Sequence, residues 1–392
     1  MSSAKKKVYI SACGIGLGHI GRVVAVADIL RDNGVECIFS TYGPAYKYIT
    51  AAGYEAYDSP VLMWDEYQDG SIAVTSSVAK MGLYIRKFGI HMEQERKRLS
   101  HVKPDAILVD TRYSTVFATG HYDAPHFFLS NQIRFLMPRW EERYLMRWAS
   151  NRITRANHHW LRRAEAIFFP DFPPPDTISR DNAAVPERLM KRLTFVGPIY
   201  RAKPEDFPER GEICRRNGFD GGLFVYAAVS GPGRTRAPII DALKSVLPEF
   251  DRKSLIVKGD PSDASSEWLG SRVNVRGWTD SRFELLKACS VVVSRPGLTT
   301  LSEIARFGKA CVLIPTPTQS EQEGNARAMA DHGSARVVDQ ASVDRDTLRE
   351  ALDDMVSRAE DYEKSAKRLQ ELAVRHDGAR KVAERMLEHL GR

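Results

Sequence analysis

The sequence has no long hydrophobic run, which excludes a membrane-spanning helix. Across its 392 residues, no stretch approaches the roughly 20 apolar residues that such a helix needs. Lysines stand at positions 5, 6 and 7, but the apolar run after them is too short for a signal peptide and leads directly into glycines. We therefore expect a cytoplasmic chain in which any membrane contact is peripheral.

The sequence also lacks paired cysteines. Its five cysteines are scattered, with no C-x-x-C or histidine-flanked spacing typical of a metal site. This pattern favours reduced thiols in a cytosolic protein, and we expect no bound metal. The five are Cys13, Cys37, Cys214, Cys289 and Cys311.

Neither sign of charge dominates the composition. The chain has 57 basic and 50 acidic residues, and its formal net charge of +7 is modest for this length. The positions of the charged residues along the chain are therefore more informative than the net charge. Most of the excess lies in residues 132–166, which contain eight arginines and three glutamates.

Short β-branched runs alternate with helix-periodic segments through both halves of the chain. Residues 8–13, 19–34 and 35–41 predict a strand, a helix ended by Gly34 and a second strand. The alternation restarts after a linker rich in proline and charge at 195–211. This pattern predicts an α/β protein with two Rossmann-like, doubly wound domains of parallel strands. The predicted domains are 1–196 and 197–375, followed by a C-terminal helix at 376–392 that packs back on the first domain.

The first predicted strand ends in the segment ISACGIGLGHIGR, which has the G-x-G-x-x-G spacing of a dinucleotide-binding loop at Gly16, Gly18 and Gly21. Such a site normally has an acidic residue at the end of the second strand, to bind the ribose. Here that strand ends Phe39-Ser40-Thr41. The missing acid argues against a dinucleotide, and we expect no cofactor.

His19 gives the glycine loop a different interpretation. An imidazole at the first turn of a helix, beside glycines that let a substrate approach, can accept a proton from a hydroxyl. The alternative is a histidine that only caps or packs. Ligands of open parallel sheets bind at the carboxyl ends of the strands. In the first domain those ends carry, besides His19 and its glycines, Asp110, Asn131 and Gln132.

The second domain has polar, glycine-rich strand ends of its own, so the sequence predicts one cleft with a different ligand on each side. SRPGLTTLSEIARFG places Gly297 at a turn, Thr299 and Thr300 at a helix start, and Glu303 about one turn later. A helix N-terminus suits a diphosphate, and the carboxylate suits ribose hydroxyls. Taken alone, a glutamate such as Glu303 is more often a solvated helix residue. Other candidate donor-binding residues are Ser230, Gly231, Arg234, Trp278, Gln322, Glu323 and Asn325.

Together these motifs resemble glycosyltransferases of the GT-B fold. The resemblance is carried by four motifs: G-x-G-x-G-H near the start, a V-G-P-I linker, S-R-P-G-x-x-T-x-x-E-I and Q-x-E-Q-E-G-N-A. With these motifs the chain resembles the family of the bacterial peptidoglycan lipid II N-acetylglucosaminyltransferase and its archaeal relatives that build lipid-linked glycans. The resemblance implies that Gly16, Gly18 and His19 serve the acceptor. It likewise implies that Glu303 holds the donor ribose, and that Gln322 and Asn325 touch the donor sugar.

The implied reaction is an inverting transfer from a UDP-sugar, with UDP-N-acetylglucosamine as first choice, to a lipid-linked acceptor. His19 would be the base, oriented or replaced by Asp110. The loop Gly16-Leu17-Gly18 departs from the double glycine of the peptidoglycan enzyme, and Ser230-Gly231-Pro232-Gly233 departs from its G-G-S-Q-G-A loop. These departures argue against a muramyl acceptor and favour the archaeal branch. Rival interpretations are a soluble glycosyltransferase acting on a small acceptor and a GT-B-fold sugar-nucleotide epimerase.

The basic segment 132–166 interleaves arginine with tryptophan. Such a belt suits the headgroup region of an anionic membrane, and the candidate docking residues are Trp140, Arg143, Arg147 and Trp148. The alternative is a helix packed on the first domain with solvated arginines. We expect no nucleic-acid partner, because no recognised binding module is present.

Overall fold

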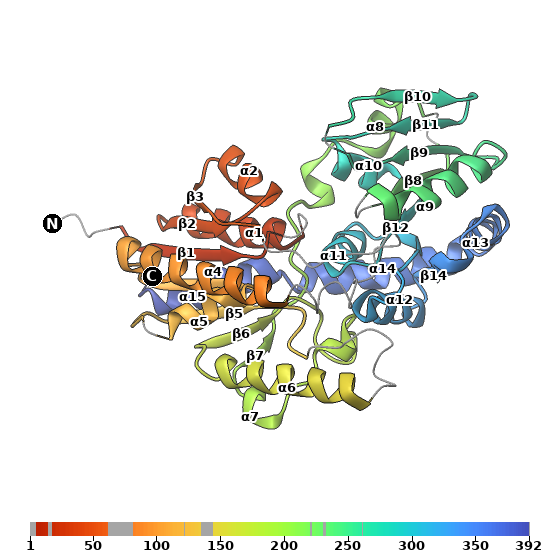
Figure 1. Ribbon diagram of the computed structural model, residues 1–392. Coiled ribbons are helices and arrows are strands. Elements are labelled where there is room, and N and C mark those ends of the chain that lie inside the picture. The colour runs from red at the N-terminus through yellow and green to blue at the C-terminus, as the bar shows by residue number, and fades with distance from the viewer. Residues whose placement is uncertain are drawn as a thin grey trace. The chain divides into compact units, whose positions relative to one another are not determined.

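The structure is a computed structural model that describes residues 5–14, 18–61, 81–120, 122–134, 144–219, 222–229, 233–260 and 262–391. The chain divides into two units (Figure 1). Unit 1 comprises residues 1–65, 72–201 and 376–392, and unit 2 comprises 66–71 and 202–375. The chain therefore returns to unit 1 for its last helix. The predicted fold class is confirmed, because each unit is built on a doubly wound sheet.

The sheet of unit 1 has seven strands in the order β3-β2-β1-β4-β5-β6-β7, paired in parallel. Its central strands read as continuous apolar runs because helices cover both faces of the sheet. The strands are β1 (Lys7–Ala12), β2 (Glu36–Thr41), β3 (Glu55–Asp58), β4 (Ala106–Asp110), β5 (His126–Leu129), β6 (Ala166–Phe169) and β7 (Leu193–Phe195).

Two hydrophobic cores lie on the two faces of this sheet. On one face, α1 and α15 pack against each other and on β1, and Met386 is fully buried there. On the other face, Leu99 of α4, Val116 of α5 and Leu161 of α6 are buried on the sheet. The helices of unit 1 are α1 (Gly18–Asp32), α2 (Pro44–Ala51), α4 (Met81–Val102), α5 (Tyr113–Thr119), α6 (Tyr144–Leu161), η2 (Arg180–Asn182), α7 (Glu187–Met190) and α15 (Gly378–His389).

The predicted first β-α-β unit is present at the centre of this sheet. Helix α1 ends at Asp32, and Gly34 follows with φ 76°, a conformation that favours glycine after a helix. Strand β1 lies between β2 and β4, so the strand order reverses direction between β1 and β4. In open α/β sheets, ligands bind at the carboxyl ends of the strands at such a reversal.

Unit 2 has a seven-stranded sheet in the order β10-β11-β9-β8-β12-β13-β14, which is parallel except for the antiparallel pair of β10 and β11. Its strand order reverses between β8 and β12. The strands are β8 (Phe224–Ala228), β9 (Lys253–Val257), β10 (Ser266–Leu269), β11 (Val273–Arg276), β12 (Val291–Ser294), β13 (Ala310–Leu313) and β14 (Ala335–Val337).

The helices of unit 2 flank this sheet, and the core on one of its faces includes Leu243, Leu348 and Met355. The helices are η3 (Pro204–Asp206), α8 (Arg210–Arg216), α9 (Gly233–Val246), α10 (Arg282–Ala288), α11 (Leu298–Arg306), α12 (Ser320–Asp331), η4 (Gln340–Ser342), α13 (Arg345–Ser357) and α14 (Ala359–Arg375). Within the described ranges, no helix is long and apolar enough to cross a membrane.

Candidate active site

His19 and Asp110 meet where the strand order of unit 1 reverses. His19 is the second residue of α1, which follows β1, and Asp110 is the last residue of β4. Although 91 residues separate them in the sequence, His19 Nδ1 lies 2.8 Å from Asp110 Oδ1. The carboxyl group is completely buried, whereas a quarter of the imidazole surface is exposed. The structure thus places a partly accessible histidine on a buried carboxylate.

Arg22 completes this arrangement, and the sequence analysis missed it. Its Nε donates to Asp110 Oδ2 and its Nη2 to Asp110 Oδ1, each at 2.5 Å. Its Nη1 donates to Asn131 Oδ1 at 2.9 Å. One turn of α1 brings Arg22 beside His19, and Nη2 lies 3.0 Å from His19 Nδ1. We call His19, Arg22, Asp110 and Asn131 the Asp110 cluster.

A local signal could have identified Arg22. It stands between Gly21 and Val23, and Val26, one turn later on the same face of α1, is also buried. Arginine is almost never fully buried unless it is paired. An arginine on the apolar face of a predicted helix therefore indicates a buried anionic partner, although it does not say which one.

The charges of the cluster keep Asp110 ionised. Burial alone would raise the pKa of its carboxyl group, but the positive charge of Arg22, the charge of His19 and their hydrogen bonds outweigh burial and lower the pKa to about 2. Asp110 is therefore a carboxylate at neutral pH, and it accepts hydrogen bonds through both oxygens.

The other predicted acceptor-binding residues lie around this cluster. Gly18 begins α1, and Gln132, half-buried, accepts a hydrogen bond from the Tyr113 hydroxyl at its backbone carbonyl. Asn131 is buried, and its side chain supports Arg22. Gly16 lies outside the described residues. The structure thus brings Gly18, His19, Asp110 and Asn131 to one edge of the sheet.

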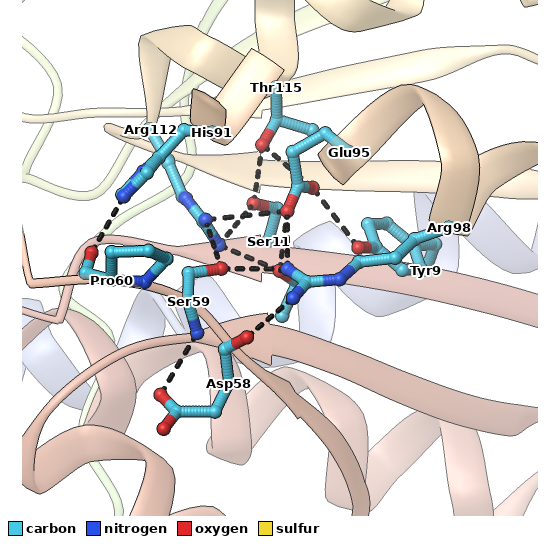
Figure 2. Close-up of polar contacts among 11 residues, drawn as sticks. Tyr9, Ser11, Asp58, Ser59, Pro60, His91, Glu95, Arg98, Arg112 and Thr115 are labelled. Carbon is cyan, nitrogen blue, oxygen red and sulfur yellow. Dashed lines mark hydrogen bonds and ion pairs between the residues drawn. The ribbon is translucent and has the colours of Figure 1, made fainter. Parts of the chain in front are cut away.

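A second buried polar cluster surrounds Glu95 of α4 (Figure 2). Glu95 is fully buried there, and one of its oxygens accepts from Ser40 Oγ at 2.6 Å and from Arg98 Nη1 at 3.1 Å. Arg112 Nη2 lies 3.3 Å from that oxygen. Its other oxygen accepts from the hydroxyls of Tyr9 and Thr115. We call these six residues the Glu95 cluster.

The Glu95 cluster anchors the segment that carries Asp110. Arg112 follows Asp110 by two residues, and it also donates to Ser59 beyond the end of β3. Thr111, between them, has φ 52°, which is uncommon for a residue other than glycine. The buried ion pair of Arg112 with Glu95 and its hydrogen bond to Ser59 thus help to hold the chain in the conformation that directs Asp110 toward α1.

In unit 2, the predicted ribose-binding residue is buried and paired. Gly297 precedes α11, and Thr299 and Thr300 lie in its first turn, both partly exposed. Glu303 is 5 % exposed, so it is not a solvated helix residue. Its Oε1 accepts from Arg282 Nη2 at 2.6 Å. The sequence analysis did not identify Arg282, which lies at the start of α10 with its guanidinium 4.2 Å from the Phe283 ring centroid.

The residues predicted in a polar loop after β13 lie instead in the first half of α12, which contacts the turn before α11. Gln322 Oε1 accepts from the backbone N–H of Thr316 at 2.9 Å. Asn325 is fully buried, and its Nδ2 donates to the carbonyl of Pro296 at 3.0 Å. Asn325 thus braces the turn that carries Gly297, whereas the neighbouring Glu323 is half-buried. A direct contact of Gln322 or Asn325 with a sugar stays a prediction.

For the remaining predicted site residues, the structure describes few side-chain contacts or none. Trp278, half-buried, donates from its indole nitrogen to Asp280. Ser230, Gly231, Trp140 and Arg143 lie outside the described residues, as do the side chains of Arg234 and Arg147. Trp148 of α6 is 55 % exposed. Their predicted roles in donor and membrane binding stay predictions.

Residues 255–385 match the glycosyltransferase family 28 C-terminal domain. The chain carries a glycosyltransferase domain. This range includes α10, α11 and α12, and therefore Glu303, Gln322 and Asn325. The resemblance predicted from the sequence is confirmed for this part of the chain.

Curated relatives extend the similarity to nearly the whole chain. An uncharacterized glycosyltransferase of Methanosarcina mazei is 24% identical over 378 residues, which cover 95% of this chain and 96% of the relative. A Bacillus cereus protein named UDP-N-acetylglucosamine--N-acetylmuramyl-(pentapeptide) pyrophosphoryl-undecaprenol N-acetylglucosamine transferase 1 is 28% identical over 212 residues, covering 46% of this chain and 58% of the relative.

Solved glycosyltransferase structures share the fold. The glycotransferase of kitacinnamycin superimposes with a TM-score of 0.71 at 17% identity and covers 99% of this chain and 100% of its own. Acinetobacter baumannii MurG superimposes with a TM-score of 0.63 at 14% identity, covering 98% of this chain and 99% of its own. The glycosyltransferase domain therefore belongs to a chain with the GT-B fold of two Rossmann-like domains.

Proposed function

We propose that this glycosyltransferase moves a sugar from a UDP-sugar to a hydroxyl of a lipid-linked acceptor, with inversion at the anomeric carbon. The observation that carries the proposal is the contact between the partly exposed His19 and the buried Asp110 at the carboxyl edge of the first sheet. UDP-N-acetylglucosamine is the first choice of donor, because the Bacillus cereus relative is named for it.

His19 acts as the general base. The acceptor hydroxyl loses its proton to the imidazole as its oxygen attacks the anomeric carbon. The bond between that carbon and the diphosphate oxygen breaks, and UDP leaves with the electron pair. A positioned base contributes typically about 10²–10⁴-fold to the rate. Asp110 balances the positive charge that the imidazole gains.

Unit 2 binds the donor. The N-terminus of α11 after Gly297 supplies backbone N–H groups and a positive dipole for the diphosphate. The Glu303 carboxylate, held by Arg282, accepts hydrogen bonds from the ribose hydroxyls. Asn325 supports this role indirectly, because it fixes the turn in front of α11.

The exposed side chains on the surface of unit 1 are the reason for proposing a lipid-linked acceptor. Trp148 of α6 is exposed, and the Arg152 guanidinium lies 5.4 Å from its ring centroid. On α4, which packs on the same face of the sheet, Leu83, Ile85 and Ile90 are also exposed. Exposed apolar side chains beside arginines suit the headgroup layer of an anionic membrane. The proposed location is accordingly the cytoplasmic face of the membrane.

A soluble glycosyltransferase acting on a small acceptor is a second candidate. It is favoured by the structural neighbours, which include the glycotransferase of kitacinnamycin and the calicheamicin glycosyltransferase CalG4, with TM-scores of 0.71 and 0.69. Such an enzyme would need no exposed apolar surface on α4 and α6.

A labelled-sugar screen separates these candidates. The purified chain is incubated with nucleotide sugars carrying a labelled sugar, with and without a membrane lipid extract. Label that moves into the organic phase only when the extract is present supports the proposal. Label that stays in nucleotide sugar of altered configuration without lipid would indicate an epimerase. Label on a water-soluble acceptor instead would favour the second candidate.

The role of His19 has its own test. His19→Ala should lower kcat by about 10²–10⁴-fold and leave UDP binding intact, because the donor is bound by unit 2. His101→Ala is the matched control, since His101 lies exposed at the end of α4. Turnover of His19→Ala within a few fold of the wild type would remove His19 as the base.

A further inference from the structure

The Asp110 cluster contains a histidine nitrogen that faces both a hydrogen-bond acceptor and a donor. His19 Nδ1 lies 2.8 Å from the Asp110 carboxylate and 3.0 Å from Arg22 Nη2. A guanidinium can only donate and an ionised carboxylate can only accept. In a neutral imidazole, Nδ1 can therefore satisfy only one of these two neighbours.

The shorter contact determines which nitrogen carries the proton. If Nδ1 had no hydrogen, its lone pair would face a carboxylate oxygen at 2.8 Å, which is repulsive. With a hydrogen on Nδ1, that contact becomes a charge-assisted hydrogen bond. Arg22 Nη2 then keeps acceptors of its own, Asp110 Oδ1 at 2.5 Å and Thr111 Oγ1 at 3.2 Å. In a neutral His19, the arrangement therefore places the hydrogen on Nδ1 and leaves the lone pair on Nε2.

This tautomer depends on the charge of Asp110, and that charge depends on Arg22. Asp110 has no exposed surface, and burial disfavours a carboxylate. Without the guanidinium, the neutral carboxylic acid becomes the favoured form in the buried site. A neutral Asp110 can donate its own hydrogen to Nδ1, so the imidazole hydrogen moves to Nε2, which then cannot accept a proton from a substrate.

We propose that Arg22 is a positioning residue that fixes the tautomer of His19 by keeping Asp110 a carboxylate. It acts through Asp110 and does not touch the substrate. Asn131 supports it, because its side-chain oxygen accepts from Arg22 Nη1 and keeps both of the other guanidinium nitrogens directed at the carboxylate.

Among the residues that the structure describes, the titratable and charged groups that face the Asp110 carboxyl group are His19 and Arg22, both from α1. Strand β1 places Ala12 opposite Asp110, and Asn131 comes from beyond β5; neither residue titrates. Arg112, two residues after Asp110, directs its guanidinium to Ser40, Ser59 and Glu95. A change at Arg22 therefore alters the main charge that acts on Asp110.

The direct test is a nitrogen NMR measurement of the histidine tautomer. The full chain, labelled with ¹⁵N-histidine, is compared as wild type, Arg22→Met, Arg22→Lys and Arg31→Met, with His19→Gln identifying the His19 signals. Arg31 is the matched control, because it lies in the same helix but forms an exposed ion pair with Asp28. Wild type, Arg22→Lys and Arg31→Met should show the hydrogen on Nδ1, and Arg22→Met should show it on Nε2.

A kinetic readout follows if the proposed glycosyl transfer is correct, on which this part of the inference rests. In Arg22→Met, the active carboxylate form of Asp110 appears only at higher pH. We therefore expect kcat at pH 7 to fall at least tenfold, with partial recovery at alkaline pH and an unchanged KM for the donor. A purely structural role would instead lower kcat by the same factor at every pH.

The outcomes separate the inference from the function. A wild-type His19 with its hydrogen on Nε2 overturns the inference, and so does Arg22→Met with an unchanged tautomer. If Arg22→Met does not fold, as judged by its thermal transition, the wild-type and Arg22→Lys spectra still decide. A tautomer that changes as expected in a protein that transfers no sugar supports the role of Arg22 and removes the proposed function.

Discussion

Replacing Glu95 by glutamine tests whether the Glu95 cluster stabilises unit 1 through its charge. Glutamine keeps the shape of the side chain but leaves the guanidinium groups of Arg98 and Arg112 in a buried site without an anion (Figure 2). It also places an amide N–H₂ where one carboxylate oxygen accepts hydrogen bonds. Breaking a buried ion pair by removing one partner costs about 3–5 kcal/mol. We expect a loss of about 3–5 kcal/mol in the free energy of unfolding.

The pH dependence of this loss has a definite sign. Burial favours the neutral acid, but Arg112, the Ser40 hydroxyl, Arg98 and the Tyr9 hydroxyl together lower the pKa of Glu95 below its usual value. A group with a lowered pKa in the folded state stabilises the protein above its unfolded pKa. The stability difference between wild type and Glu95→Gln should therefore be complete at neutral pH. It should shrink as the pH falls through the lowered pKa of Glu95.

Urea denaturation followed by far-ultraviolet circular dichroism measures the difference. Glu93→Gln is the matched control, because Glu93 lies two residues away on α4, is largely exposed and pairs only loosely with Lys97 at 3.6 Å. Exposed pairs contribute up to about 1 kcal/mol, so the control should be close to wild type. A Glu95→Gln protein within about 1 kcal/mol of wild type at pH 7 would refute the reasoning.

Two further predictions concern donor and membrane binding. Glu303→Gln should weaken UDP binding by about 10- to 100-fold, because hydrogen bonds to a charged group contribute about 1.5–3 kcal/mol; calorimetric titration measures this, with the exposed Glu350 of unit 2 changed to Gln as the control. An unchanged affinity would exclude Glu303 from the ribose site. Replacing Trp140, Arg143 and Arg147 together by alanine should release the protein from anionic phosphatidylserine vesicles in a sedimentation assay. Equal sedimentation of the variant and wild type would contradict the docking role.

Several strands were not predicted, and three of them lack the usual local signal. β3 is only half-buried, and β10 is an exposed edge strand, so neither has the apolar run typical of a buried parallel strand. β7 has three residues and is only partly buried. These segments are strands because a neighbouring strand offers backbone hydrogen bonds, which residue type alone does not reveal. The long apolar runs of β1, β4, β12 and β13 could be identified from the sequence.

The sequence by itself determined the features that depend on near neighbours in the chain. Helical spacing and glycine turns placed His19 at the start of α1 and Glu303 in the second turn of α11. The sequence also named Asp110 as a residue at a strand end that could orient His19. The tertiary structure decided which distant groups meet. Strand order brings β1 beside β4, which joins His19 to Asp110, and the burial of Asp110 gives Arg22 its role. Arg282 meets Glu303 in the same way, across 21 residues. A buried charge needs a partner, but only the packing of the chain selects it.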